Sequence, residues 1–155
     1  MKLFINKTIM SYKGKFHPQH PEKYFGNLDK IIYRSLWERK CMDFFDRNTD
    51  ILQWGSEPVG IQYYSPLQNK WRKYFPDFYV KRRLEDGIIE QLMIEIKPLK
   101  QTLEPKKPLT KKGNKKYINE RFLWSINSAK WKAAEEWCNK RKIKFIKLTE
   151  KDLGL

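Results

Sequence analysis

Apolar residues recur at three- and four-residue spacing along the stretch DKIIYRSLWERKCMDFFDRN, which begins at Asp29. This spacing predicts an amphipathic helix over residues 29–48, with Asp29 as its candidate N-cap. Lys40 falls inside the apolar stripe, so the match to the helical period is imperfect. The predicted stripe consists of Tyr33, Leu36, Trp37, Cys41, Phe44 and Phe45.

Two stretches after this helix have the composition of β-strands. The segment ILQWGSEPVGIQYYSP combines β-branched and aromatic residues with glycine and proline, and it predicts either one bent strand or two short strands. After the turn SPLQNK, the segments WRKYFPDFYVKRR and IIEQLMIEIKP are both strand-like, and the turn signal EDG lies between them. Together they predict an antiparallel hairpin that ends at Pro98.

The last third of the chain predicts a basic loop, a helix and a strand. Residues 97–117 are rich in lysine and proline without apolar periodicity, which favours a long, basic, mobile loop. The segment SINSAKWKAAEEWCNKRK predicts a helix capped by Ser125 or Ser128, and IKFIKLTE predicts a closing strand. The expected apolar face of this helix carries Ile126, Ala129, Ala133 and Trp137.

The predicted order of elements, α, β, β, β, α, β, indicates an α/β fold. A chain of 155 residues is long enough for one core and does not require a second domain. We therefore expect one domain over residues 29–155, preceded by an irregular arm, residues 1–28, whose aromatic side chains pack back on the body. Cys41 and Cys138 lie in apolar helical contexts, where buried free thiols are expected.

Lysine and arginine outnumber aspartate and glutamate by 33 to 18, which gives a formal net charge of +15. Such a charge indicates a polyanionic partner, although charge alone suits nucleic acid, membranes or acidic proteins. No apolar run approaches the roughly 18 residues of a membrane span. The first residues also lack a signal-peptide pattern, so we expect a soluble intracellular protein that is neither secreted nor bound to a membrane.

A small set of acids and one lysine carries the candidate chemistry. Side chains alternate between the two faces of a strand, so Glu95 and Lys97 project to the same side of the second hairpin strand. If the hairpin loop is the three residues 85–87, the register places Asp77 directly opposite Glu95. A two-residue loop would instead place Asp77 opposite Ile96 and on the other face. The predicted site therefore depends on this register.

Two adjacent carboxylates beside a sheet repel each other in a low dielectric, so their pairing indicates a cation site. Oxygen ligands favour Mg²⁺, for which Mn²⁺ can substitute, over zinc, and no small-molecule cofactor is expected. Lys97 would lie beside the attacking water or the scissile phosphate, where it offsets charge in the transition state. Helical geometry places Glu38 at the rim of the apolar stripe, within reach of the same edge. This combination is the chemistry of phosphodiester hydrolysis.

These motifs resemble those of a known family. FPDFYV followed by IEIKP is similar to the motif of PD-(D/E)xK nucleases, and SLWERKCMDFF resembles the N-terminal helix of the TnsA-like group. The likeness covers residues 24–153, nearly the whole chain. It implies a restriction-endonuclease-like αβββαβ core, in which helices flank a central mixed sheet. It also implies metal binding by Asp77, Glu95 and Glu38 and catalysis by Lys97.

The likeness extends to the small head completion nucleases of tailed phages through YRSLWERK, YFPDFYV and SAKWKAAEEWC. It implies an endonuclease that trims packaged DNA in the host cytoplasm or in the virion, with phage head or portal proteins as partners. The TnsA-like group often has glutamine at the second acid, where this chain has Glu95, so behaviour specific to TnsA does not follow. Two alternatives stay open: a structure-specific or transposon-end nuclease that acts as a dimer or with a partner, and a non-catalytic DNA-binding protein of the virion.

Several basic residues are candidates for contact with the DNA backbone, with ordinary solubilising charge as the alternative. They flank the predicted hairpin, lie in the loop that follows Lys97, or lie near the start of the second helix, where Trp131 could equally be buried. The loop lysines emerge just after Lys97, so we expect them within reach of anything bound at the metal. The candidates are Lys70, Arg72, Lys73, Lys81, Arg82, Arg83, Lys111, Lys112, Lys115, Lys116 and Lys130. We expect Glu57 to form a loop salt bridge rather than to contact a metal, and His17 and His20 to lie on the surface.

Overall fold

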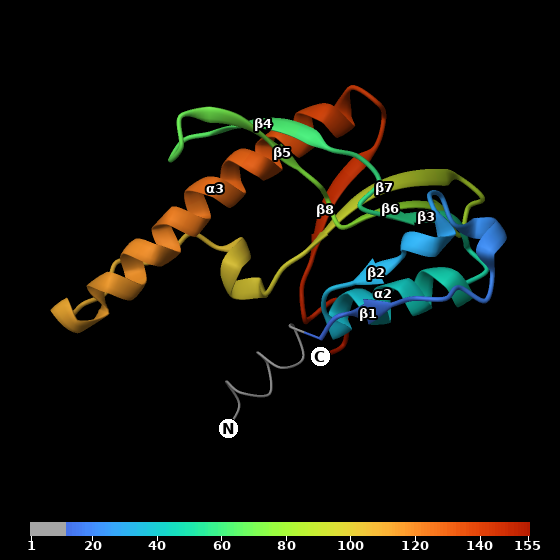
Figure 1. Cartoon of the computed structure of the whole chain (residues 1–155), viewed down its shortest axis with the longest axis horizontal. Helices are drawn as coiled ribbons and strands as arrows, with labels where there is room; N and C mark the ends of the chain where they lie inside the picture. Colours follow the sequence, from blue (N-terminus) through green and yellow to red (C-terminus); the bar gives the residue numbers. More distant parts are fainter. Residues whose placement is uncertain (1–11) are drawn as a thin grey trace.

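Four strands form a mixed sheet at the centre of the fold, in the computed structural model that describes residues 12–155 (Figure 1). The strands are β3 (Ile51–Ser56), β6 (Phe78–Arg83), β7 (Ile89–Ile96) and β8 (Lys144–Leu148). They lie in the order β3-β6-β7-β8, with antiparallel pairing except between β7 and β8, which run parallel. Helix α2 (Leu36–Arg47) precedes β3, and helix α3 (Asn114–Asn139) lies between β7 and β8 in the chain. The central sheet and its helices therefore confirm the predicted αβββαβ order.

A second, two-stranded sheet is inserted between β3 and β6. It consists of β4 (Ile61–Ser65) and β5 (Lys70–Tyr74), which pair antiparallel. The stretch after α2 thus forms two short strands, one of the two predicted outcomes. The single strand predicted over WRKYFPDFYVKRR is wrong, because β5 ends at Tyr74 and β6 begins at Phe78. Pro76 lies in the break, where a residue without a backbone N–H cannot donate to a ladder.

Helix α2 begins at Leu36, later than predicted. Ser35 is its N-cap, because the Ser35 side chain accepts a hydrogen bond from the Glu38 amide at 3.1 Å. Asp29, the expected cap, belongs instead to a 3-10 helix over Leu28–Lys30. Ile32 and Tyr33, which lie between these two helices, form a short strand that pairs with the N-terminal arm. This tertiary pairing overrides the helical spacing of the sequence.

The main core lies between α2 and the central sheet. The apolar stripe predicted for α2 is confirmed at Trp37, Cys41 and Phe45, which are buried. It is wrong at Phe44, which is 56% exposed, whereas Met42 is fully buried in its place. At about 100° per residue, the buried face is therefore centred near Phe45, and residue 38 falls within this face rather than at its rim.

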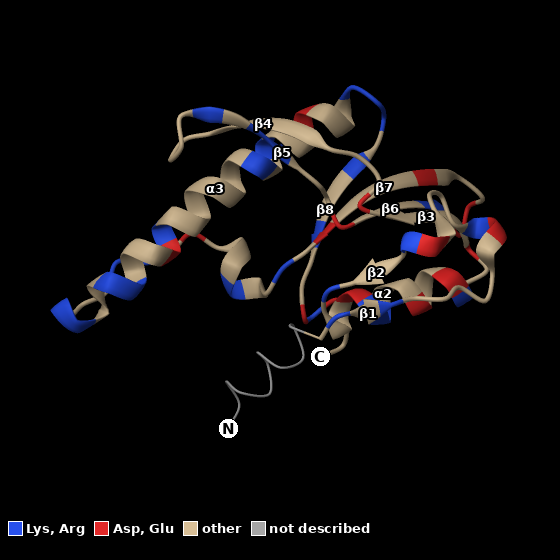
Figure 2. Ribbon diagram, viewed as in Figure 1, with Lys and Arg blue, Asp and Glu red and all other residues tan. Residues whose placement is uncertain are grey.

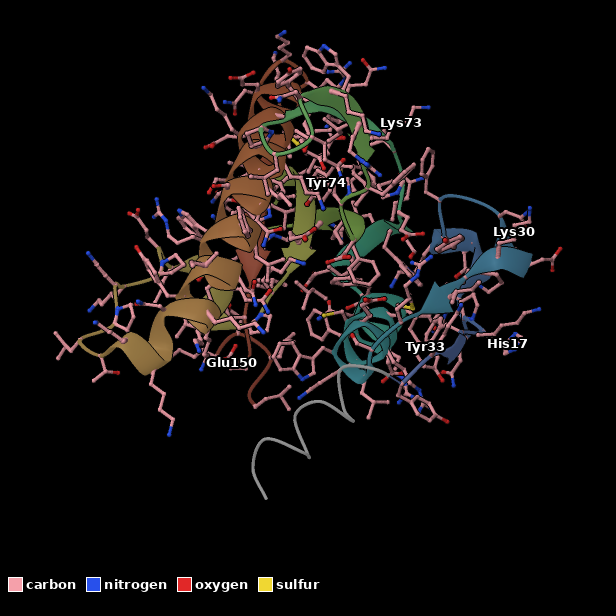
Figure 3. The ribbon with its side chains drawn as sticks, turned by 60° about the vertical axis from the view of Figure 1, so that its left-hand side comes forward. His17, Lys30, Tyr33, Lys73, Tyr74 and Glu150 are labelled. Carbon is pink, nitrogen blue, oxygen red and sulfur yellow. The ribbon has the colours of Figure 1, made fainter. Side chains whose placement is uncertain are left out.

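A smaller core joins the β4–β5 hairpin to α3. Its buried residues are Ile61, Tyr63, Tyr74, Trp131 and Ala134. Figure 3 shows Tyr74 pointing into the space between the hairpin and α3, whereas Lys73 points away from it. Trp131 is thus part of this core rather than of an exposed surface.

The second half of α3 presents a buried face that is offset from the predicted one. The buried residues of α3 are Asn127, Trp131, Ala134 and Cys138. The predicted face, Ile126, Ala129, Ala133 and Trp137, is only partly buried. The helix is therefore rotated about its axis relative to the prediction, because the large Trp131 ring fills the space under the hairpin.

Helix α3 is also longer than predicted. It begins at Asn114, inside the stretch expected to be a loop, so the candidate caps Ser125 and Ser128 lie within the helix. Its first half projects beyond the sheets (Figure 1), and apolar residues there, such as Ile118 and Phe122, are exposed. Because no sheet covers this half, its apolar residues follow no single buried face, and the sequence gives no helical period to detect.

Residues 12–28 of the predicted arm are packed against the body. Strand β1 (Gly14–Lys15) pairs with β2 (Ile32–Tyr33), and two aromatic residues of the arm, Phe16 and Tyr24, pack on the main core. The expectation that aromatic side chains of the arm pack back on the body is confirmed for these two. The arm is thus less irregular than predicted.

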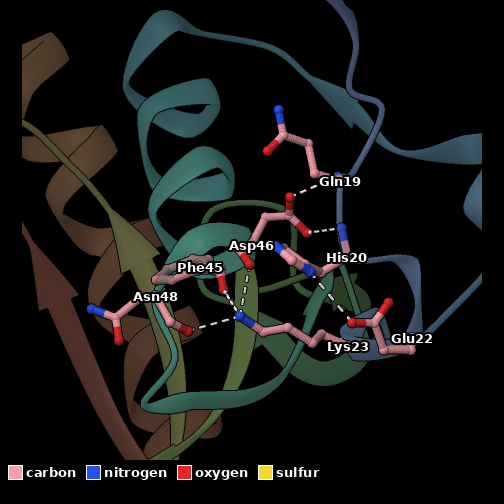
Figure 4. A network of polar contacts seen from close by, with 7 residues as sticks. All are labelled: Gln19, His20, Glu22, Lys23, Phe45, Asp46 and Asn48. Carbon is pink, nitrogen blue, oxygen red and sulfur yellow. Dashed lines mark hydrogen bonds and ion pairs between the residues drawn. The ribbon is translucent and has the colours of Figure 1, made fainter.

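Asp46, near the end of α2, fastens this arm. Its two carboxylate oxygens accept hydrogen bonds from the amide of Gln19 at 2.7 Å and from the amide of His20 at 3.1 Å (Figure 4). Lys23 completes the connection, because its ammonium group donates to three backbone oxygens where α2 ends. These oxygens belong to Phe45, Asp46 and Asn48. Lys23 therefore satisfies carbonyl groups that the end of a helix leaves free.

Both cysteines, Cys41 and Cys138, are free and buried, as predicted. Within residues 12–155, no helix has the length and apolar character to cross a membrane. The first part of the predicted arm, residues 1–11, lies outside the described residues.

Candidate active site

The hairpin that joins β6 to β7 has the predicted register. Its loop is the three residues 85–87, closed by backbone hydrogen bonds between the residues on either side. Phe78 pairs with Ile94, so Asp77 and Glu95 occupy the next positions outward. The predicted juxtaposition of these two acids is therefore confirmed, at the end of the sheet where β6 begins and β7 ends.

Asp77 lies one residue before β6, with its carboxyl group beside the end of β7. Its Oδ2 accepts a hydrogen bond from the Ile96 amide at 2.7 Å, and its backbone oxygen accepts one from the Glu57 amide at 2.9 Å. Burial raises the pKa of Asp77 well above its ordinary value, and the negative charge of Glu95 raises it further. The charge of Glu38 acts in the same direction, against the Ile96 amide. The site is therefore short of positive charge.

Glu95 is buried, with 4% of its surface exposed, and both of its carboxylate oxygens have protein partners. Oε1 lies 3.3 Å from the Nζ atom of Lys97, and Oε2 accepts a hydrogen bond from the hydroxyl of Tyr74. Burial and the charge of Glu95 together raise the pKa of Tyr74, so its hydroxyl keeps its proton and acts as the hydrogen-bond donor to Glu95. The sequence prediction missed Tyr74, because it treated the residues on both sides of Pro76 as one strand.

Glu38 approaches the same end of the sheet from the first turn of α2. Its Oε2 accepts a hydrogen bond from the amide of Arg34 at 2.8 Å. Burial raises the pKa of Glu38, the amide and charge of Arg34 lower it, and the charges of Glu57 and Glu95 raise it again. Arg34 also forms an ion pair with Glu57, which confirms the salt bridge expected for that residue. Arg34 therefore fixes Glu38 through its backbone amide and Glu57 through its guanidinium group.

Cys41 marks the place where α2 meets these acids. Burial raises the pKa of its thiol to about 12, and the negative charges of Asp77 and Glu38 contribute to this shift. The three predicted acids thus share one environment, although they come from α2, from the residue before β6 and from β7. We refer to Asp77, Glu95, Glu38 and Lys97 together as the acid centre.

The acid centre is an open arrangement rather than a closed cage. Among residues 12–155, no group of three or more histidine, cysteine, aspartate or glutamate side chains is close enough to hold a metal ion by itself. The three carboxylates are each turned toward protein donors, which are the amides of Ile96 and Arg34 and the Tyr74 hydroxyl. Mg²⁺ typically takes one or two carboxylates and completes its shell with waters and phosphate oxygens. A partial, all-oxygen donor set fits Mg²⁺ better than zinc.

One of the basic residues predicted to contact DNA, Lys130, lies beside the acid centre. Its Nζ atom is 5.8 Å from the centre of the Tyr63 ring and 5.7 Å from that of the Tyr74 ring. Burial lowers the pKa of Lys130, and the charge of Lys97 lowers it further, whereas Glu95 opposes this shift. Lys130 of α3 is therefore the second lysine at the site, in addition to Lys97.

Seven of the other predicted DNA-binding residues lie farther away, whereas Lys70, Arg72 and Lys73 are on β5 of the hairpin, and the charge of Arg72 acts on Lys130. Three of the seven, Lys81, Arg82 and Arg83, are at the end of β6 opposite Asp77, and Arg82 is paired with Glu90. The lysines of the predicted loop lie at the far end of α3 (Figure 2). These are Lys111, Lys112, Lys115 and Lys116. The helical rise separates Lys115 from Lys130 by about 22 Å. The loop lysines therefore do not lie beside the acids, and the prediction that they would is wrong.

The two histidines are also outside the site. His20 lies 3.5 Å from Glu22 at the surface of the arm, and His17 is close to it in the chain. Neither belongs to a group of metal-binding side chains in the described part of the chain.

Comparison with known proteins finds relatives over nearly the whole chain. The family described as TnsA-like endonuclease N terminal matches residues 48–150. The head completion nuclease of Enterobacteria phage T4 is 43% identical over 146 residues, which make up 93% of this chain and 95% of that protein. No solved structure matches the chain. The family match includes Asp77, Glu95 and Lys97, whereas Glu38 precedes it.

Proposed function

Because this chain belongs to the TnsA-like endonuclease family, we propose that it cleaves DNA with the help of Mg²⁺, for which Mn²⁺ can substitute. Asp77, Glu95 and Glu38 are the proposed metal-binding acids, and Lys97 is the proposed catalytic lysine. The observation that carries this proposal is the register of β6 and β7, which sets Asp77 beside Glu95 while Lys97 shares the face of Glu95.

The electrostatics of the acid centre support a bound cation. The pKa of Asp77 is raised by burial and by Glu95. A positive charge between Asp77 and Glu95 would therefore stabilise the folded protein. When bound, Mg²⁺ would supply positive charge to the phosphate ester and lower the cost of its attack by water. The carboxylates of Asp77 and Glu95 would hold it, with Glu38 as the third acid.

The chain's own residues have separate roles in this proposal. Lys97 is partly exposed although its partner Glu95 is buried, so its Nζ atom can contact a phosphate oxygen while Glu95 fixes its position. The proton on Nζ offsets the negative charge that develops on the phosphate oxygens. Tyr74 fixes the other oxygen of Glu95, and its buried ring keeps water away from that side of the carboxylate.

We further propose that the protein acts in the completion of the heads of a tailed phage. This rests on its identity of 43% with the phage T4 head completion nuclease, which matches this chain over almost its whole length. The proposed substrate is packaged DNA, the proposed partners are head or portal proteins, and the proposed place of action is the host cytoplasm during virion assembly.

Cleavage of supercoiled plasmid tests the enzymatic proposal. We expect the wild-type protein to cut with Mg²⁺ and not with EDTA, and we expect Asp77→Ala and Lys97→Ala to lose cutting with Mg²⁺ as well. Lys132→Ala is the matched control, because Lys132 is an exposed lysine of α3 outside the acid centre, and it should cut normally. DNA binding without cutting under any metal would instead support a structural protein of the virion.

Metal binding can be tested without any cleavage. A ligand that binds only the folded state stabilises it by mass action, so Mg²⁺ should raise the thermal midpoint of the wild type in the absence of DNA. The rise should be smaller in Asp77→Ala. Equal rises in both proteins would exclude a metal at this acid.

A further inference from the structure

The β4–β5 hairpin has two faces of different character. On the inner face, Ile61, Tyr63 and Tyr74 pack against α3. The cross-strand pairs that point the other way are Gln62 with Lys73 and Tyr64 with Trp71. We call this second side, together with Phe75 in the next position, the outer face.

The outer face is a row of exposed aromatic rings. Trp71 is 67% exposed, Tyr64 is 46% exposed and Phe75 is 49% exposed. The Trp71 and Tyr64 rings meet edge to face, with their centres 5.6 Å apart. The Phe75 ring lies over Gly60, where an added Cβ would come within 3.1 Å of it, so a glycine leaves room for the ring. Lys73 stands between the two ends of the row.

Trp71 is unusual among the tryptophans of this protein. All six lie within the described residues, and the other five are buried or partly buried. A cross-strand aromatic pair stabilises a hairpin, which would account for Tyr64 and Trp71 being neighbours. That role does not require either ring to be exposed, nor does it account for Phe75, which stands beyond the pair.

The charge around these rings has a single sign. No aspartate or glutamate occurs between Glu57 and Asp77, whereas β5 carries Lys70, Arg72 and Lys73. None of these three cations forms an ion pair with any residue in the range 12–155. Of the three, Lys73 lies on the outer face between the rings, whereas Arg72 and Lys70, which pair with Tyr63 and Ser65, belong to the other face of the hairpin. Exposed rings with an unpaired cation between them match the chemistry of single-stranded nucleic acid, in which bases stack on the rings and phosphates meet the cations.

We propose that the outer face of the β4–β5 hairpin binds unpaired nucleotides of the DNA that the acid centre cuts. This inference rests on the proposed function and specifies its substrate: DNA with a single-stranded segment next to the cleaved bond. Bases in a duplex hide their faces in the stack, whereas unpaired bases of any sequence offer a face to an aromatic ring.

The chain connects this face directly to the acid centre. Phe75, at one end of the row, is two residues before Asp77, and Tyr74, the residue before Phe75, donates a hydrogen bond to Glu95. Trp71, at the other end, lies about 10 Å further along the strand from Tyr74. A single strand that follows the row from Trp71 to Phe75 would therefore run in the direction of Asp77 along the chain.

Binding in EDTA separates this proposal from cleavage. The probes are a fluorescein-labelled oligothymidylate and a blunt duplex of the same length, measured by fluorescence anisotropy. We expect Trp71→Ala to weaken binding of the single strand by about tenfold, the effect of losing one stacked base, and to change binding of the duplex by less than about twofold. Trp71→Phe should restore most of the affinity, because it keeps a ring.

Phe44→Ala is the matched control, since Phe44 is an exposed aromatic residue on α2, away from the hairpin. It should bind both probes like the wild type. Equal losses for the two probes in Trp71→Ala, or no loss for the single strand, would overturn the proposal. Thermal unfolding of each variant shows whether Trp71 only stabilises the hairpin, in which case the midpoint falls while both affinities stay unchanged. Because these measurements record binding and not cutting, their outcomes do not depend on whether Asp77→Ala abolishes cutting.

Discussion

Within the acid centre, both carboxylate oxygens of Glu95 have a protein partner and the side chain is buried. On the outer face of the hairpin, Trp71 lies in solvent near Lys73, which pairs with no acid in the described chain. The two regions are separated by only a few residues on either side of Pro76. One is organised around fixed atoms, and the other around an accessible surface.

This difference determines how each region responds to change. Charges in a buried site interact strongly, so the loss of one group alters the pKa values and positions of its neighbours. Charges on an exposed face are screened by salt, and each makes a small and nearly independent contribution. We therefore expect substitutions in the acid centre to act on the rate of cutting, and substitutions on the hairpin to act on DNA affinity.

Asp77→Asn should give the largest effect. It removes one of the proposed metal-binding oxygens, and we expect cutting to fall by about a thousandfold or more while DNA binding is retained. In EDTA at neutral pH the same variant should have a higher thermal midpoint than the wild type, because it removes a buried negative charge that Glu95 repels. Plasmid cleavage and thermal unfolding measure the two effects.

The stability difference should also depend on pH. The folded-state pKa of Asp77 is raised, so the wild type gains stability as the pH falls through that pKa, and the gain is complete below the ordinary value of 3.8. The advantage of Asp77→Asn should therefore shrink as the solution becomes more acidic. If the higher thermal midpoint of Asp77→Asn stayed constant with pH, the charge of Asp77 would not be what destabilises the wild type.

Tyr74→Phe should have an intermediate effect. The ring stays in the core, but Glu95 loses its hydroxyl partner, and we expect cutting to slow by about ten- to hundredfold, as for other residues that orient a ligand. The loss should be in kcat rather than in KM, because Tyr74 acts through Glu95. Tyr63→Phe, a change on the same inner face, is the control and should leave kcat intact. A rise in KM with kcat unchanged would instead show that Tyr74 contributes to DNA binding.

Neutralising the hairpin cations should give the smallest effect. With Lys70, Arg72 and Lys73 all changed to Gln, the slope of log Kd against log salt should fall by about 2 to 3, which is close to one for each phosphate that is no longer neutralised. The same change at Lys81, Arg82 and Arg83 should matter less, because Arg82 is already paired with Glu90. Equal slopes for the two triple variants would remove the distinction between these surfaces.

The acid pair could be predicted from the sequence because local rules determine it. Strand alternation sets Glu95 and Lys97 on one face, and the three-residue loop sets the register that brings Asp77 opposite Glu95. Both rules act over a few residues, and neither depends on how the rest of the chain packs. The loop and the register of the hairpin were therefore predictable, whereas the extent of its first strand was not.

The limits of the prediction lie where distant segments decide. The start of α2 depends on pairing between β1 and β2, and the length of α3 is not marked by a buried face. Tyr74 was missed for a related reason: the break at Pro76 makes β5 part of a separate hairpin that packs on α3, and this arrangement brings the Tyr74 hydroxyl to Glu95. The loop lysines were predicted too close to the acids because the early start of α3, at Asn114, was not predicted. The first half of this helix separates these lysines from the acids.

The last strand of the chain, β8, supports the strand that carries Glu95. The two run parallel, Glu95 is paired with Lys147, and the Lys97 amide donates to the oxygen of Leu148 at 3.0 Å. A ribosome makes Asp77 and Lys97 long before it makes this support. An unfinished copy thus lacks the strand that pairs with β7, so we expect the proposed cutting activity to begin only after β8 has been synthesised.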